Sequence, residues 1–183
     1  MMATSSRRRL RLLSTKVIAI VLMTVASNGY ASDTVNTTFK AVYVDKANNI
    51  HLVFHDGRDK KISSSGNAAS ATLAPDKNSA AWLVLHAWIA PGAAGPGASQ
   101  LALYTHGQLR HIKCEPFIRD YWFWMGGRQI AIDCGGRHFA GTLILHDVET
   151  LRPVDSIVQA DVPEEQRPAW SRPDSDKAIA VPP

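Results

Sequence analysis

The chain has little cysteine and none of the short motifs that mark several large enzyme classes. Its 183 residues contain two cysteines, Cys114 and Cys134, and one pair without a second is not the pattern of a structural zinc site. No G-x-S-x-G, H-E-x-x-H, phosphate-loop or dinucleotide-binding pattern occurs. We therefore predict a protein that is not an enzyme and that needs neither a cofactor nor a metal ion.

The apolar run near the start of the chain is too short to span a bilayer. It extends from Val17 to Ala26, follows an arginine-rich stretch and precedes the small residues around Tyr30. A membrane-spanning helix needs about 20 apolar residues, whereas this order of segments is typical of a secretory signal peptide. We predict a signal-peptide helix in residues 1–31, cleaved after Ala31 or alternatively after Ala26, then a disordered linker over residues 32–38. The mature protein is then periplasmic or secreted, with no stable membrane span.

The excess of positive charge belongs to this leader. The formal net charge is +4, but five Lys and Arg and no acid precede residue 31, which leaves 15 basic against 16 acidic residues in the remainder. A domain with that balance lacks the basic surface that nucleic acid requires. We expect another protein of the cell envelope as the partner, and self-association into a homo-oligomer stays open.

The two cysteines are expected to form a disulfide in an oxidising compartment outside the cytoplasm. Mirrored about a turn at Gly126-Gly127, Cys134 falls opposite Arg119, and Glu115-Pro116 would bend Cys114 back towards that end of the strand. Two buried free thiols are the alternative.

Short strand patterns separated by turn residues fill the chain from Phe39 onward. The clearest is Asp120 to Met125, in which Trp122 and Trp124 alternate with Tyr121 and Phe123. Because successive side chains of a strand point to opposite faces, this alternation predicts a strand that is buried on both sides. The paired glycines after it favour a tight turn, and three more strands complete a four-stranded unit: Gln129 to Cys134, Thr142 to His146 and Leu151 to Ile157.

This unit recurs along the chain. The turns at Asp56, His106 and Asp147 lie 50 and 41 residues apart, close to the blade period of about 40 to 50 residues in β-propellers. Further strands are expected at 39–45, 50–55, 59–63, 70–73, 79–85, 100–104 and 108–113, with a strand, turn and strand over 168–181. We predict an all-β domain, residues 39–181, of antiparallel four-stranded meanders stacked as a partial or small β-propeller.

Two segments carry a family resemblance. Arg167 to Ala180, which reads RPAWSRPDSDKAIA, resembles with two inserted residues the Pro-x-Trp-Ser-Pro-Asp-Gly-Lys-x-Ile-Ala pattern of TolB-type propeller blades, and Leu73 to Trp82 is similar to a weaker copy. The resemblance implies WD-like blades that serve exported proteins as interaction surfaces. About twelve strands make about three blades, whereas closed propellers have four to eight. Either the blades form an open stack or a second copy completes a ring.

The function indicated by these features is an exported, non-catalytic binding or protein-interaction module. Its contact surface is expected at the loop Trp88 to Gln100, within the Ala/Gly/Pro-rich stretch, together with the turn ends of the blades. The candidate binding residues are Trp88, His86, His106 and His146. Trp82 and Trp170 are interpreted as core residues at corresponding places in neighbouring repeats.

Aspartates in the turns offer an alternative function. Asp56, Asp76, Asp147 and Asp174 occupy positions where Asp commonly accepts backbone hydrogen bonds, and we interpret them as turn caps. A periplasmic hydrolase or metal-dependent enzyme that uses these Asp and nearby His side chains is the competing hypothesis. His51 and His55 share a strand face but lie about 13 Å apart at 3.3 Å per residue, too far to bind one ion together.

Overall fold

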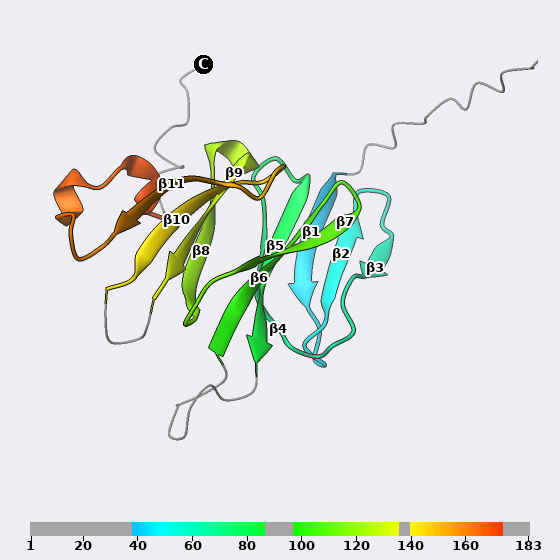
Figure 1. Cartoon of the computed structure of the whole chain (residues 1–183). Coiled ribbons are helices and arrows are strands. Elements are labelled where there is room, and N and C mark those ends of the chain that lie inside the picture. The colour runs from blue at the N-terminus through cyan, green and yellow to red at the C-terminus, as the bar shows by residue number, and fades with distance from the viewer. Residues whose placement is uncertain (1–37, 87–96, 136–139, 174–183) are drawn as a thin grey trace, which may run out of the picture. The chain divides into compact units, whose positions relative to one another are not determined.

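The computed structural model describes residues 38–86, 97–135 and 140–173. The predicted signal peptide, Trp88, Asp174 and the predicted strand at the C-terminal end lie outside these residues. The described part is all-β, with eleven strands and three 3₁₀ turns (Figure 1). The strands are β1 (Phe39–Val44), β2 (Ile50–Phe54), β3 (Asp59–Lys61), β4 (Ala68–Leu73), β5 (Ser79–His86), β6 (Gly97–Thr105), β7 (Gln108–Lys113), β8 (Ile118–Trp124), β9 (Gln129–Cys134), β10 (Thr142–Asp147) and β11 (Pro153–Val158).

The strands form three antiparallel sheets in the order of the sequence. The first contains β1, β2 and β3, the middle one β4 to β7, and the third β8 to β11. Within each sheet a strand pairs only with its neighbours in sequence, so each sheet is a meander. The predicted four-stranded unit in residues 119–157 is thereby confirmed, and the same arrangement recurs in the middle sheet.

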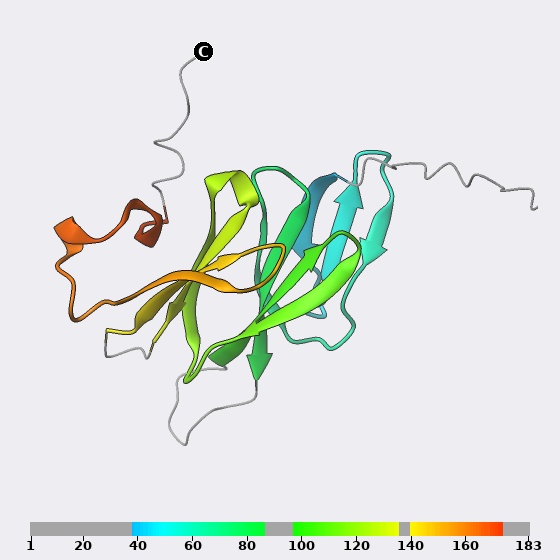
Figure 2. The same ribbon diagram turned by 45° about the horizontal axis from the view of Figure 1, so that its top comes forward.

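The three sheets pack face to face, with the middle sheet between the other two (Figure 2). Along β5, Trp82 packs with Ile50 and Leu52 of the first sheet. The neighbouring Ala81 points the other way and packs with Phe123 and Ile132 of the third sheet. Both faces of the middle sheet are therefore buried. A strand buried on both faces needs a continuous apolar run, such as residues 80–85.

Strand β8 also buries both of its faces, as its alternating aromatic residues predict. Tyr121 and Phe123 belong to the core shared with the middle sheet, whereas Trp122 and Trp124 pack on the opposite face of the third sheet. The Tyr121 hydroxyl donates to the carbonyl oxygen of Ser70 and lies 2.9 Å from that of Ala81, and burial raises the pKa of this phenol. One strand thus links the middle sheet to the far face of the third.

A segment without strands covers that far face. Residues 159–173, here called the C-terminal strap, contain the 3₁₀ turns η2 (Glu164–Gln166) and η3 (Ala169–Ser171). Trp170 packs on Trp122 and Trp124. Trp170 is a core residue as predicted, but the expected strand beginning at Pro168 is wrong, and Trp170 does not correspond to Trp82 on β5. Pro163, Pro168 and Pro173 each lack a backbone N–H, which makes pairing as a central strand unfavourable.

Several predicted boundaries also shift. Strand β6 begins at Gly97, three residues before the expected start at residue 100. Strand β11 begins at Pro153, because Leu151 has a positive φ of 57° and belongs to the preceding turn. The turn after β8 is the 3₁₀ segment η1 (Met125–Gly127), in which Gly126 and Gly127 adopt φ of 69° and 103°, the left-handed geometry that paired glycines provide.

The predicted disulfide joins Cys114 to Cys134, with their Cα atoms 5.7 Å apart. Cys134 lies opposite Ile118, one residue from the expected Arg119, because the register of β8 and β9 shifts between Ile118 and Asp120. The bond ties the end of the middle sheet to the third sheet.

Candidate functional site

A surface pocket of about 210 Å³ lies where turns of the middle and third sheets meet. In a meander, alternate turns fall at the same end of the sheet, which brings the β4–β5 and β6–β7 turns together, and likewise the β8–β9 and β10–β11 turns. These four turns supply the pocket, here called the turn-end pocket. Its lining residues are Asp76, Asn78, Ser79, Thr105, His106, Gly127, Arg128, Asp147, Val148 and Glu149.

The floor of the pocket is polar although it is buried. Ser79 and Thr105 are paired across β5 and β6, and each is 2% exposed. By strand alternation they point to the same side as Ala81 and Leu103, towards the third sheet. The Thr105 hydroxyl oxygen has no hydrogen-bond partner. A buried hydroxyl without a partner costs about 1 to 3 kcal/mol, so a polar ligand that reaches this floor would recover part of that cost.

The walls are held together by contacts between the turns, both within the third sheet and across to the middle sheet. Arg110 of β7 donates from its guanidinium to the carbonyl oxygens of Val148, at 2.8 Å, and of Glu149. The Val148 amide donates to the carbonyl oxygen of Arg128 at 3.0 Å. Gly127 packs so closely that a Cβ there would lie 2.9 Å from the carboxyl carbon of Asp76. The shape of the pocket is therefore fixed by packing of one turn on another.

Carboxylates in the pocket are oriented by their own turns. Asp76 Oδ1 accepts the Asn78 amide at 2.9 Å, and Asp147 Oδ1 accepts the amide and hydroxyl of Thr150, each at 2.8 Å. The Thr150 hydroxyl and amide bonds hold the pKa of Asp147 below its usual value. Glu149 Oε2 lies 3.3 Å from Nδ1 of His106 at the rim. The lining thus combines three carboxylates with the Arg128 guanidinium and the His106 imidazole, and the Arg110 guanidinium also acts on Asp147 to lower its pKa.

The predicted binding residues do not form one site. His106 lines the turn-end pocket. His146 is buried, with Nδ1 3.0 Å from the carbonyl oxygen of Leu151, and it is not among the lining residues. His86 lies seven positions beyond Ser79 on β5, at the opposite end of the middle sheet, about 23 Å away at 3.3 Å per residue. Two of the residues predicted to share one contact surface, His86 and His106, therefore lie at opposite ends of the middle sheet.

The predicted turn caps are present where the aspartates are described. Asp56 accepts the Arg58 amide at 3.0 Å, as Asp76 and Asp147 do in their own turns. Sequence reasoning missed Arg128, Glu149 and Thr105 as lining residues. Their positions beside the repeat turns were a signal, but only the packing of the sheets brings them together.

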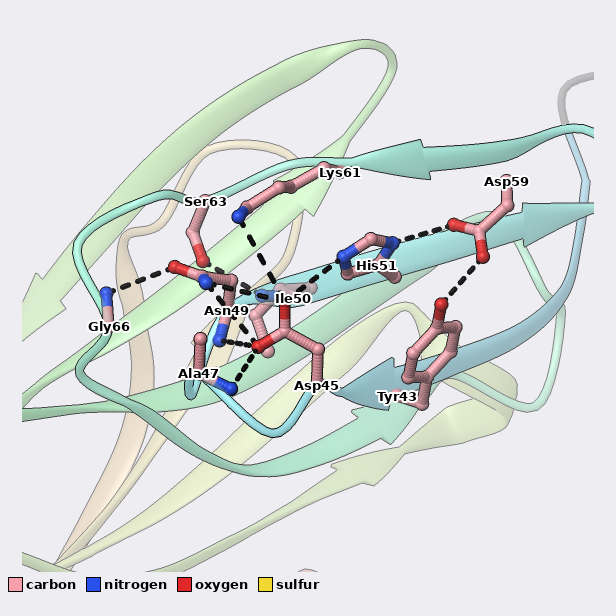
Figure 3. A network of polar contacts seen from close by, with 10 residues as sticks. All are labelled: Tyr43, Asp45, Ala47, Asn49, Ile50, His51, Asp59, Lys61, Ser63 and Gly66. Carbon is pink, nitrogen blue, oxygen red and sulfur yellow. Dashed lines mark hydrogen bonds and ion pairs between the residues drawn. The ribbon is translucent and has the colours of Figure 1, made fainter.

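A second polar cluster lies on the outer face of the first sheet (Figure 3). The His51 ring stacks on Tyr43 with centroids 4.9 Å apart, and its nitrogens lie 2.8 Å from Asp59 and 3.3 Å from Asp45. The Tyr43 hydroxyl donates to Asp59 at 2.6 Å, and Lys61 Nζ lies 3.9 Å from Asp45. Each of these side chains has a partner in the same cluster.

Hydrogen bonds lower the pKa of two carboxyls in this cluster, those of Asp45 and Asp59. The Asn49 amide is the largest cause at Asp45, and the Tyr43 hydroxyl is the largest at Asp59. Because each folded-state pKa lies below its unfolded value, the contribution to stability is present above about pH 4 and is lost as the pH falls below it. The cluster therefore contributes to the stability of the outer face of the first sheet.

Metal ligation has no candidate in the described ranges, where no three His, Cys, Asp or Glu side chains form a group able to hold an ion. None of the helices in the described part of the chain is long and apolar enough to cross a membrane.

Comparisons with known proteins give a structural similarity and no family. No protein-family model matches the chain, and no curated protein matches it significantly. Among solved structures, it is similar to a protein of unknown function from Bacteroides caccae, with 16% sequence identity and a TM-score of 0.32. The match covers 69% of this chain and 60% of that one, so this chain spans about three fifths of that protein's length.

Proposed function

We propose that the protein is an exported, non-catalytic binding module built from TolB-like blades, and that it recognises another envelope protein at the turn-end pocket. The observation that carries the proposal is the convergence of four turns from two sheets on one pocket with an unpartnered hydroxyl at its floor. Loops positioned by a rigid scaffold are common places for binding residues. Two of the three carboxylates there, Asp76 and Asp147, are already used as turn caps, which favours recognition over proton transfer.

Export is part of the same proposal. The leader in residues 1–31 and the disulfide between Cys114 and Cys134 support it, since disulfides persist mainly in oxidising compartments. The sequence also resembles TolB-type blades, which belong to exported interaction proteins. The four-stranded meanders agree with such blades.

Site-specific photo-crosslinking in whole cells tests the binding surface. A photoreactive amino acid replaces His106 or Glu149 at the pocket rim, or Val154, which is 54% exposed on β11 and outside the pocket. We expect a discrete adduct from the two rim positions and none from Val154. Adducts of equal yield from all three positions, or none from either rim position, would contradict the proposal.

A further inference from the structure

The turn-end pocket has a charge pattern that selects one class of ligand. Asp76, Asp147 and Glu149 contribute three carboxylates, and Arg128 contributes one guanidinium. The Arg128 side chain is turned towards its own turn, where Nε donates to the Met125 carbonyl oxygen at 3.3 Å. Arg110 adds a second guanidinium behind the pocket wall, so the three carboxylates outnumber the guanidiniums by one and an anionic group would be repelled.

The lining also has more hydrogen-bond acceptors than donors. A carboxylate has about four acceptor sites, of which the bonds from Asn78 to Asp76 and from Thr150 to Asp147 use only part. The unpartnered Thr105 hydroxyl at the floor can accept a hydrogen bond from an incoming donor, and it also has one O–H to donate. A compact group with several N–H donors and a positive charge fits this arrangement.

The size of the pocket favours a side chain over a whole ligand. Its volume of about 210 Å³ is below the range of about 300 to 1,000 Å³ typical of small-molecule sites. A lysine ammonium is a compact charge with three donors on a flexible apolar stem. The length and flexibility of this stem let the ammonium reach the carboxylates.

We propose that the turn-end pocket binds the primary ammonium of a lysine side chain presented by a protein partner, held by Asp76, Asp147 and the Thr105 hydroxyl. This rests on the proposed binding function and specifies its chemistry. The partner then has an exposed lysine at the centre of its contact surface, and the neighbouring Glu149 attracts further basic residues around it.

The test measures binding of a model side chain by NMR. The probe is Nα-acetyl-lysine-N-methylamide. It is titrated into isotope-labelled protein, purified from cells as the mature chain that remains after any processing of the leader. We expect saturable shifts of the Thr105, Gly127 and Val148 amides, and weaker binding at high salt because exposed charges are screened. The same compound acetylated on its side-chain nitrogen has no charge, and should give no saturable shift.

Matched variants locate the site. Asp76→Asn and Asp147→Asn keep a side-chain acceptor for the turn but remove the charge, and each should weaken lysine binding about tenfold, as loss of one charge-assisted contact does. Asp56→Asn alters an equivalent turn cap outside the pocket and should leave binding unchanged. Equal weakening by all three variants would overturn the assignment, as would equal binding of the charged and acetylated probes.

The outcome separates this inference from the proposed function. If the rim positions crosslink a partner but the lysine probe gives no saturable shift, the binding module stands and the ammonium assignment is wrong. If crosslinks and probe binding both fail, both proposals are wrong. Binding of the corresponding glutamate probe in place of lysine also overturns the ammonium assignment.

Discussion

Neighbouring aromatic side chains of β8 pack on opposite faces of the third sheet. Trp124 is 7% exposed and packs with Leu145 and Trp170, whereas Phe123 beside it packs towards the middle sheet. A residue in such a place touches elements far apart in the sequence, so its removal is felt by more than its own strand.

Trp124→Ala is expected to lower the free energy of unfolding by about 3 to 5 kcal/mol, since it leaves a large cavity in the core of the third sheet. Urea denaturation followed by circular dichroism measures the loss. Leu109→Ala is the control, because Leu109 is 41% exposed and surface substitutions of this kind change stability by about 0.5 kcal/mol or less. Similar midpoints for both variants would contradict the assignment of Trp124 to the core.

The buried carboxyl of Asp133 makes stability depend on pH. Asp133 is 8% exposed, accepts a hydrogen bond from Gln159 Nε2 at 2.9 Å and lies 3.6 Å from a guanidinium nitrogen of Arg119. Burial nevertheless raises its pKa above the usual value. A raised folded-state pKa means that the stabilising contribution is present at low pH and is lost as the pH rises through that pKa.

Asp133→Asn removes this titration. Relative to the unmodified protein, the variant should therefore gain stability between pH 3.5 and pH 7, whatever constant offset the altered hydrogen bonds introduce. Urea titrations of both proteins at the two pH values give the change in the difference. A difference that is constant, or that moves against the variant as the pH rises, would show that the Arg119 and Gln159 contacts outweigh burial.

At the scale of elements, the C-terminal strap takes the place of a further strand pair on the third sheet. The Trp122 indole donates to the Trp170 carbonyl oxygen and the Trp170 indole donates to Asp155 Oδ2, each at 2.8 Å. Arg167 donates to the carbonyl oxygens of Val162 and Gln159, which shapes the strap before it reaches Trp170. The strap covers the indoles by side-chain anchoring and needs no ladder of backbone bonds.

Trp170→Ala should uncover this face. We expect increased quenching of the remaining tryptophan fluorescence by acrylamide, and a loss of stability of about 3 kcal/mol or more from the lost packing. Asp155→Asn, which keeps the indole and an acceptor oxygen, should change both readouts little. If the Trp170 variant shows unchanged quenching, the strap does not protect Trp122 and Trp124.

At the scale of the whole molecule, the described stack ends differently on its two sides. The outer face of the first sheet carries the cluster of Tyr43, Asp45, His51 and Asp59, in which polar groups are paired with one another. The outer face of the third sheet is covered by the strap. Repeat proteins commonly end in such atypical, polar or covered units, which protect the stack from further addition.

We therefore expect a monomer, with no second copy needed to complete a ring. Size-exclusion chromatography with light scattering should give the mass of one chain over a wide range of concentration. A stable dimer of the unmodified protein would overturn this expectation. Self-association that appears only in Trp170→Ala would agree with it, because that variant exposes an apolar face.

Export predicts a defined mass for the mature chain. Cleavage after Ala31 leaves Ser32 at the new N-terminus, and oxidation of Cys114 and Cys134 removes two hydrogens, so intact mass spectrometry with and without reductant checks both. We expect this species in the envelope fraction of producing cells. Recovery of the full chain from the cytoplasm with two free thiols would contradict the export proposal.

The order of the strands from Phe39 to Val158 could be read from the sequence because their signals are local. Alternation at Tyr121 to Trp124 and the glycines after it define a strand and a turn whatever the rest of the chain does. The same local rule gives a wrong result at Trp170. The motif around it resembles a strand, but Pro168 and Pro173 lie on either side and the segment forms a 3₁₀ turn. The burial of Trp170 was predicted correctly, but the element that buries it was not.

The amino-acid sequence by itself determined that the domain is all-β, that its strands follow as meanders, and that β8 is buried on two sides. Only the tertiary structure decided that His106 and His86 lie at opposite ends of a sheet, and that Asp76, Thr105, Asp147 and Glu149 surround one pocket. The physical reason is the range of the interactions. Strand and turn preferences act between neighbours in sequence, whereas the pocket depends on which face of one sheet packs against another.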